Sequence, residues 1–288
     1  MPNAHVNGLD IEYVTQGNPS DPALLLVMGL GAQLIAWPPE FVDQLVAHGF
    51  FVITYDNRDV GLSTKFEGLP DMGGLFAGTG SAPYSIEDMA DDGVALLDHL
   101  GIGRAHVVGA SMGGMITQAM VIRYPERFLS ACSIMSNTGD RSNGMPTGEA
   151  MGALLRPPAT NREEAIASGL EGARIIGSPG YPAPEAEVIE HAGAAYDRCF
   201  FPEGTVRQLA AILSSPDRTE ALHAVTLPFL VIHGEADVLV QPSGGEATAA
   251  AVPGAKLLTF PGMGHDLPKA LFADVVDAVV ANTALASV

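Results

Sequence analysis

The pentapeptide GASMG at residues 109–113 places a serine, Ser111, where a catalytic nucleophile could stand. Residues 104–108 before it have the apolar character of a short buried strand, and residues 113–124 after it carry apolar side chains at helical spacing. A G-x-S-x-G pattern between a strand and a helix is typical of a nucleophile elbow, a turn so tight that the residues two before and two after the serine must be small. We therefore predict that the Ser111 hydroxyl stands exposed at the carboxyl end of a strand.

A serine hydroxyl is a weak nucleophile at neutral pH and needs a base within hydrogen-bond reach. His265 ends the loop 262–265, which follows the last predicted strand and contains two glycines, so the loop can bring the imidazole over the sheet edge. Asp237 follows another predicted strand, and its carboxylate can orient this imidazole and stabilise the imidazolium that forms. Glu235 competes for that role but lies closer to the strand end, so we favour Asp237.

Acyl transfer also needs N–H donors for the oxyanion of the tetrahedral intermediate. We expect one donor to be the backbone N–H of Met112, at a helix N-terminus where N–H groups are free and the dipole is positive. The second donor should come from the loop 28–31 after the strand predicted at residues 23–28. We choose the N–H of Leu30, with Gly31 as the alternative.

The elements that must position these residues alternate between strand and helix, which predicts a parallel sheet with helices on both faces. The expected strands cover residues 11–15, 23–28, 50–55, 104–108, 129–135, 228–232 and 256–260, and the expected helices cover residues 37–48, 85–100, 113–124, 244–251 and 267–281. The segment 68–83 is rich in glycine and proline and is expected to be a loop. Since all three candidate catalytic side chains follow strands, the fold would gather them at one sheet edge.

The alternation stops in residues 137–215, where helical stretches are separated by proline and glycine and no buried strand is expected. We expect helices to start near Asn161 and Pro184, and a third to cover residues 205–213. This segment is interpreted as a helical lid (cap) domain. The core domain would then comprise residues 1–136 and 216–288.

Composition limits what the chain can bind. The 288 residues are 47% hydrophobic, enough to cover both faces of a sheet, and the formal net charge of −19 disfavours nucleic acid, anionic membranes and anionic substrates. Cys132 and Cys199 are too far apart in sequence for a metal knuckle, and we expect no metal and no cofactor. No signal peptide and no membrane-inserting segment is visible, so we expect the protein to be cytoplasmic. We also expect it to be a monomer or homodimer and to take a small-molecule ester as its substrate.

Taken together, these motifs resemble those of the α/β-hydrolase superfamily over essentially the whole chain, and the order serine, aspartate, histidine is the one found there. The resemblance rests on residues 28–31, residues 55–63, the Ser111 elbow, the Asp237 turn and Gly264-His265. Within the superfamily the chain looks most like lidded bacterial carboxylesterases related to aclacinomycin methylesterase. Many relatives have a histidine where Met28 stands, a change that spares the backbone donors.

The resemblance implies the α/β-hydrolase fold: a mostly parallel central sheet, helices on both faces and a helical lid inserted after the sixth strand. It also implies a structural role for Asp56 and Arg58 in a turn near the site. The predicted activity is carboxylic ester hydrolysis through Ser111, His265 and Asp237, on small to medium, neutral, largely apolar esters.

One fold hosts many reactions, and the type of the nucleophile helps to distinguish among them. Haloalkane dehalogenases and epoxide hydrolases of the superfamily use an aspartate where Ser111 stands, which disfavours both. Cofactor-free perhydrolases (haloperoxidases) keep the serine triad and stay open as an alternative, as do C–C bond hydrolases. A non-catalytic binding protein on the same scaffold is the third alternative, although such relatives have usually lost a triad member.

Overall fold

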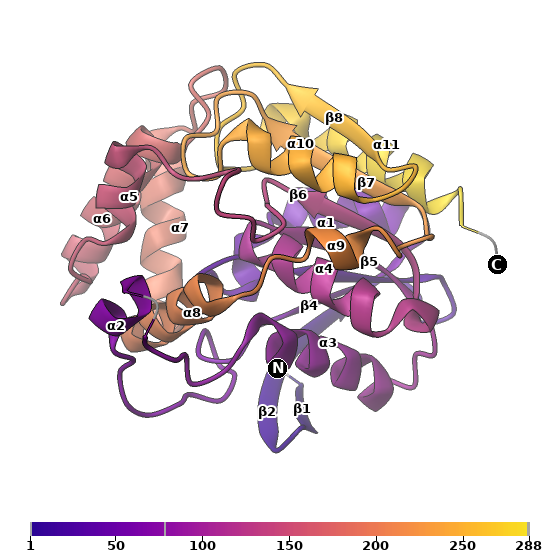
Figure 1. Ribbon diagram of the computed structural model, residues 1–288, viewed down its shortest axis with the longest axis horizontal. Coiled ribbons are helices and arrows are strands. Elements are labelled where there is room, and N and C mark those ends of the chain that lie inside the picture. Colours follow the sequence, from indigo (N-terminus) through magenta and orange to yellow (C-terminus); the bar gives the residue numbers. More distant parts are fainter. Residues whose placement is uncertain (1, 78, 287–288) are drawn as a thin grey trace.

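The centre of the molecule is an eight-stranded sheet in the order β1-β2-β4-β3-β5-β6-β7-β8 (Figure 1). The computed structural model describes residues 2–77 and 79–286, so Gly78 of the predicted loop 68–83 lies outside the described residues. The strands are β1 (Asn3–Val6), β2 (Leu9–Gln16), β3 (Ala23–Val27), β4 (Phe51–Tyr55), β5 (Ala105–Ala110), β6 (Phe128–Ile134), β7 (Phe229–Gly234) and β8 (Lys256–Phe260).

The sheet is mostly parallel, as predicted. β2 pairs antiparallel with β1 and with β4, and every pairing from β4 across to β8 is parallel. Ala110 at the end of β5 is in register with Ile134, Ile134 with Ile232, and Gly234 with Phe260. The carboxyl ends of the central strands therefore meet along one edge, and the loops that follow them are neighbours.

Helices cover both faces of this sheet because each buried strand alternates its side chains between two apolar cores. In β3, Leu25 packs into one core while Leu24 and Leu26 pack into the other. The first core is formed with α3 (Ile86–His99), α4 (Met112–Arg123), α9 (Thr219–Leu222) and α10 (Pro242–Ala251), and the second with α1 (Pro39–Ala47) and α11 (Phe272–Thr283). Short 3-10 helices form at Leu34–Ala36, Pro125–Arg127 and Lys269–Leu271.

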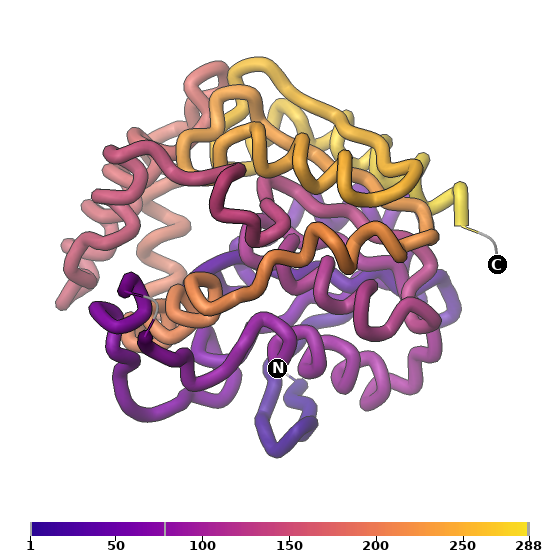
Figure 2. Tube along the Cα trace, in the orientation of Figure 1, coloured from indigo at the N-terminus to yellow at the C-terminus, as the bar shows by residue number. Residues whose placement is uncertain are grey.

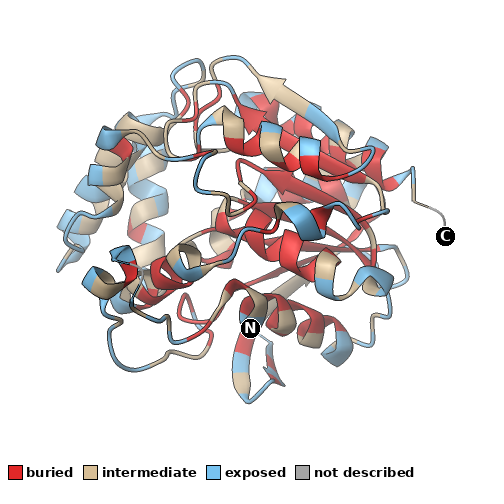
Figure 3. Ribbon diagram, in the orientation of Figure 1, coloured by how far each residue is buried: buried red, intermediate tan, exposed pale blue. Residues whose placement is uncertain are grey.

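Between β6 and β7 the chain forms α5 (Gly148–Leu154), α6 (Arg162–Ile176), α7 (Glu185–Arg198) and α8 (Pro202–Ser214). Figures 1 and 2 show α5, α6 and α7 grouped at one end of the molecule. α6 has no buried residue and α7 has one, Gly193, whereas α8 has six, and Figure 3 shows this contrast. α8 is thus the part of this segment that is most closely packed. Across residues 2–77 and 79–286, no helix has both the length and the apolar character needed to cross a lipid bilayer.

Several short elements differ from the sequence-based expectation, among them α9, which was not predicted. The predicted loop 68–83 contains α2 (Met72–Phe76), whose N-terminus is capped because the Asp71 side chain accepts a hydrogen bond from Gly74 N. The five glycines and two prolines of residues 68–83 obscure this short helix in the sequence. The edge strand β1 was not predicted, because its four residues alternate between exposed and buried and carry little apolar signal.

A buried histidine in this sheet makes the stability depend on pH. Burial lowers the pKa of His106 in β5 to about 4, and its Nδ1 lies 2.8 Å from Ser130 Oγ in β6. Since the folded pKa is below the ordinary value of 6.5, the unfolded chain takes up the proton first, and the stability present above pH 6.5 is lost as the pH falls toward 4.

We expect His106→Gln, which removes this titration, to retain more stability in acid than the wild type does. Between about pH 7.5 and 5 the free energy of unfolding should fall by on the order of 2 kcal/mol less in the variant. Urea unfolding of both proteins at both pH values measures the difference. Equal losses in the two proteins would show that His106 does not contribute to the acid sensitivity.

Candidate active site

The turn between β5 and α4 forces Ser111 into an unusual backbone conformation. Its φ of 57° and ψ of −120° lie in a region that non-glycine residues rarely occupy, while Ser111 N donates a 2.8 Å hydrogen bond to Ile134 O. A Cβ on Gly109 would lie 2.0 Å from Gly113 O, and a Cβ on Gly113 would lie 2.0 Å from Val27 O. Only glycine fits at these two positions, as the elbow pattern predicts.

The structure brings together the three side chains proposed for catalysis. His265 Nε2 lies 2.9 Å from Ser111 Oγ, and His265 Nδ1 lies 2.7 Å from Asp237 Oδ2. The Asp237 side chain is fully buried and that of His265 is 7% exposed, so bulk water does not compete for their contact. A serine hydroxyl, an imidazole and a carboxylate linked in this order can transfer the hydroxyl proton to the imidazole.

Asp237 is held by its own turn. Its Oδ1 accepts backbone hydrogen bonds of 2.9 Å from Leu239 N and from Val240 N, which leaves Oδ2 for the imidazole. Glu235, the alternative weighed from the sequence, is exposed and accepts a hydrogen bond from Thr259 Oγ1. The geometry therefore favours Asp237 over Glu235.

A second histidine lies close to Asp237 but is hydrogen-bonded to a different group. His233 is fully buried at the end of β7, its Nε2 lies 2.8 Å from Val240 O, and burial lowers the pKa of its imidazole. A neutral ring that donates from Nε2 to a carbonyl supports the Asp237 turn without placing a second cation beside the carboxylate. Its Nε2 lies 3.6 Å from Asp237 Oδ2.

The loop predicted to supply an oxyanion donor lies against the nucleophile. A Cβ on Gly29 would lie 3.1 Å from Ser111 Cβ. Gly31 N already donates a 2.8 Å hydrogen bond to Gln208 Oε1, whereas the hydrogen bonds within the described part of the chain include none donated by Leu30 N or Met112 N. This difference favours the N–H of Leu30 over that of Gly31 as the second oxyanion donor, beside the N–H of Met112.

Side chains to which the sequence analysis gave no role hold these loops in place. Asn57 Nδ2 donates to Met28 O at 3.0 Å, on one side of the oxyanion loop. Ser178, from the segment between β6 and β7, accepts a 2.8 Å hydrogen bond from Gly264 N and donates to Asp266 Oδ1. Burial raises the pKa of the Asp266 carboxyl, and the Ser178 hydrogen bond opposes that shift. The sequence alone does not show these contacts, because the partners of Asn57 and Ser178 are far apart from them in the chain.

Asp56 and Arg58 have the structural roles that the resemblance implied. Asp56 accepts hydrogen bonds from Leu34 N at 2.7 Å and Leu62 N at 2.8 Å, which fixes the chain on both sides of the turn after β4. Arg58 pairs with the buried Asp92 at 2.7 Å. Among the residues that the structure describes, no three His, Cys, Asp or Glu side chains gather as a metal site would require.

The chain is similar in sequence to known hydrolases. The family model described as the alpha/beta hydrolase fold matches residues 22–172. The chain is 31% identical to rhodomycin D methylesterase of Streptomyces peucetius, over 94% of each chain. It is 27% identical to a bifunctional esterase/perhydrolase of Acinetobacter calcoaceticus, over 91% of each chain.

A solved structure has the same fold. The enol-lactonase of Burkholderia xenovorans superposes with a TM-score of 0.78 at 24% identity, over 98% of this chain and 100% of that one. At this identity the likeness concerns the fold.

Proposed function

The chain belongs to the α/β-hydrolase fold family, and we propose that within it the protein is a serine carboxylesterase. The observation that carries the proposal is the hydrogen-bonded series of Ser111 Oγ, His265 Nε2, His265 Nδ1 and Asp237 Oδ2, with distances of 2.9 and 2.7 Å. Similarity to an esterase over 94% of the chain supports an ester as the substrate.

In the proposed mechanism, Ser111 Oγ attacks the ester carbonyl carbon while its proton passes to His265 Nε2. Asp237 keeps the imidazole in the required tautomer and stabilises the imidazolium. The N–H groups of Leu30 and Met112 donate to the oxyanion. The carbon–oxygen bond to the alkoxide then breaks, and the departing alcohol takes the proton from His265.

Hydrolysis of the acyl-enzyme repeats these steps with water. A water molecule gives a proton to His265 and attacks the acyl carbon, and the bond to Ser111 Oγ breaks as the serine recovers its proton. The products are a carboxylate and an alcohol. With a net charge of −19, the protein favours the entry of a neutral ester and the departure of its anionic product.

The substrate we propose is a small to medium, neutral and largely apolar ester. The relative at 31% identity is named a methylesterase, which supports an ester with a small alcohol group. We also propose that residues 137–215 act as a lid over the sheet edge, since Ile176 O accepts a 2.7 Å hydrogen bond from His265 N. The core domain would comprise residues 1–136 and 216–288.

A series of p-nitrophenyl esters, from acetate to dodecanoate, tests the proposal, with methyl esters of apolar acids as a second series. We expect kcat/KM to reach at least about 10⁴ M⁻¹s⁻¹ for the best substrate and to fall for the longest acyl chains. Anionic esters of the same size should react more slowly, and added salt should reduce the difference. Rates equal to those of the buffer alone for all members would contradict the proposal.

Perhydrolysis is the second candidate, because a relative at 27% identity is named an esterase/perhydrolase. In this reaction a carboxylic acid acylates Ser111 with loss of water, and hydrogen peroxide attacks the acyl-enzyme to release a peroxy acid. The peroxy acid would then oxidise bromide. Bromination of monochlorodimedone that requires both peroxide and acetate, with slow ester hydrolysis, would favour this candidate over the first.

A further inference from the structure

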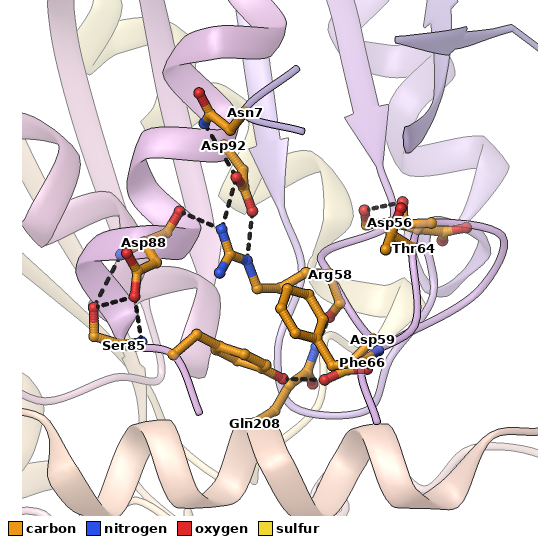
Figure 4. A network of polar contacts seen from close by, with 12 residues as sticks. Asn7, Asp56, Arg58, Asp59, Thr64, Phe66, Ser85, Asp88, Asp92 and Gln208 are labelled. Carbon is orange, nitrogen blue, oxygen red and sulfur yellow. Dashed lines mark hydrogen bonds and ion pairs between the residues drawn. The ribbon is translucent and has the colours of Figure 1, made fainter. Parts of the chain in front are cut away.

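Gln208 is a buried amide that joins two loops of the core from helix α8. Its side chain is fully buried. Its Oε1 accepts a 2.8 Å hydrogen bond from Gly31 N, and its Nε2 donates a 2.8 Å hydrogen bond to Arg58 O. A backbone donor on one side and a backbone acceptor on the other fix which end of the amide faces which loop. Figure 4 shows Gln208 reaching from its helix toward Arg58 and Asp59.

One of these two contacts is adjacent to the oxyanion loop. Gly31 directly follows Leu30, and its φ of 67° makes the chain turn at this point. Thr205, one turn earlier in α8, packs so closely that a Cβ on Gly31 would lie 2.8 Å from its Oγ1. At the other end of the loop, Asn57 Nδ2 holds Met28 O. The loop is therefore fixed at both ends, and its second anchor comes from α8.

Helix α8 is itself held rigidly against the core. Arg207 donates to both carboxylate oxygens of Asp59, at 2.8 and 2.9 Å, and their side chains are 2% and 0% exposed. Tyr84 OH donates to the same carboxylate at 2.7 Å. A buried pair with this many hydrogen bonds keeps the helix in one position, so the amide of Gln208 is presented to Gly31 in a fixed geometry.

We propose that Gln208 is a positioning residue for the oxyanion site: by binding Gly31 N–H, it orients the loop so that the neighbouring Leu30 N–H is free and directed at the carbonyl oxygen of the substrate. The inference rests on the proposed esterase function. It assigns to α8, which lies outside the sheet and its covering helices, a part in forming the catalytic site. A helix that served only as a cover would affect the binding of the substrate and not the rate of the chemical step.

The test uses three variants of the full chain. Gln208→Met keeps the length of the side chain but removes both hydrogen bonds, and Gln208→Glu keeps the acceptor for Gly31 N–H. Gln118→Met is the matched control, because it makes the same change at another fully buried glutamine, whose Oε1 accepts a 3.1 Å hydrogen bond from Arg218 Nε and not from the oxyanion loop. Thermal unfolding of each variant establishes that it is folded at the assay temperature.

We expect Gln208→Met to lower kcat by about 10- to 100-fold with little change in KM, as a displaced catalytic group does. A trifluoromethyl ketone, whose adduct with Ser111 carries an oxyanion, should bind more weakly by a similar factor. Gln208→Glu should recover most of the lost rate, and Gln118→Met should keep the wild-type kcat. Hydrogen exchange of the amides in residues 28–33 should be faster in Gln208→Met alone.

The proposal would be overturned if Gln208→Met kept both the wild-type kcat and the wild-type exchange rate. It would also be overturned if Gln208→Met raised KM without lowering kcat, or if Gln118→Met lost as much activity as Gln208→Met. Failure of the esterase proposal gives a different result, the absence of ester hydrolysis in the wild type. In that case the exchange rate of residues 28–33 decides on its own whether Gln208 positions the loop.

Discussion

Replacing Ser111 by alanine is expected to lower kcat for ester hydrolysis by about 10⁴-fold or more, with KM changed little. The hydroxyl is the atom that would form the acyl-enzyme, and it lies 2.9 Å from His265 Nε2, beside the oxyanion loop. Alanine fits the same tight turn, since only one oxygen atom is removed. The loss should therefore appear in the chemical step and not in the stability of the fold.

Ser136→Ala is the matched control for this experiment. Ser136 is buried beside the elbow, where a Cβ on Gly114 would lie 2.5 Å from Ser136 Cβ, and within the described part of the chain its hydroxyl has no hydrogen-bond partner. Its removal should change kcat by less than about threefold, because no paired group is lost. Steady-state kinetics on the best p-nitrophenyl ester compares the two variants. Retention of more than about one hundredth of the wild-type kcat by Ser111→Ala would contradict a serine nucleophile.

Asp237→Asn should have an effect of similar size, a loss of about 10⁴-fold in kcat. Asp237 Oδ2 accepts from His265 Nδ1 at 2.7 Å, and this contact places the remaining lone pair on Nε2, toward Ser111. An asparagine NH₂ directed at Nδ1 would reverse the tautomer and place a proton on Nε2, where the base is needed. The imidazole would stay in position but could no longer accept the serine proton.

Glu235→Gln is the control for Asp237→Asn, since it makes the same chemical change two residues away. Glu235 is exposed and contacts Thr259 Oγ1, so we expect kcat to change by less than about threefold. The pair of variants also decides between the two carboxylates that the sequence left open. A large loss in Glu235→Gln together with a small loss in Asp237→Asn would exchange their roles.

Sequence reasoning located the candidate catalytic side chains because each obeys a local rule. Ser111 lies in a turn whose glycines are demanded by contacts within a few residues, as Gly109 and Gly113 show. Asp237 and His265 each follow a strand, and parallel pairing brings the ends of such strands to one edge. Local spacing and one topological rule were therefore enough to place three side chains in contact across 154 positions.

The supports of the site could not be found in the same way. Gln208 contacts Gly31 across 177 positions, and Ser178 contacts Gly264 across 86. Both come from the segment between β6 and β7, whose path over the core depends on packing and not on helical periodicity. From the sequence alone, a glutamine in a helix is expected to be exposed to solvent, and only the structure shows that Gln208 is buried. The choice between the N–H groups of Leu30 and Gly31 as oxyanion donor also depended on the hydrogen bond from Gly31 N to Gln208.

The fold shows the same division between local and distant determinants. The buried strands and the long helices of the core were predicted to within a few residues, because continuous apolar runs and helical spacing extend over several residues there. α2 was missed because glycine and proline dominate its surroundings, and its cap at Asp71 becomes visible only with the turn in place. The division of the chain into a core and a lid at residues 137–215 stays a prediction.

The central claim, an acyl-enzyme on Ser111, is tested most directly by mass spectrometry of protein quenched during turnover of a slow ester or treated with a fluorophosphonate. Trypsin releases residues 105–123 as one peptide, between Arg104 and Arg123, and Ser111 is its single serine. We predict one adduct per chain on Ser111, absent from Ser111→Ala and formed far more slowly in Asp237→Asn. Ester turnover without modification of this peptide, or equal labelling of Ser111→Ala, would contradict the account.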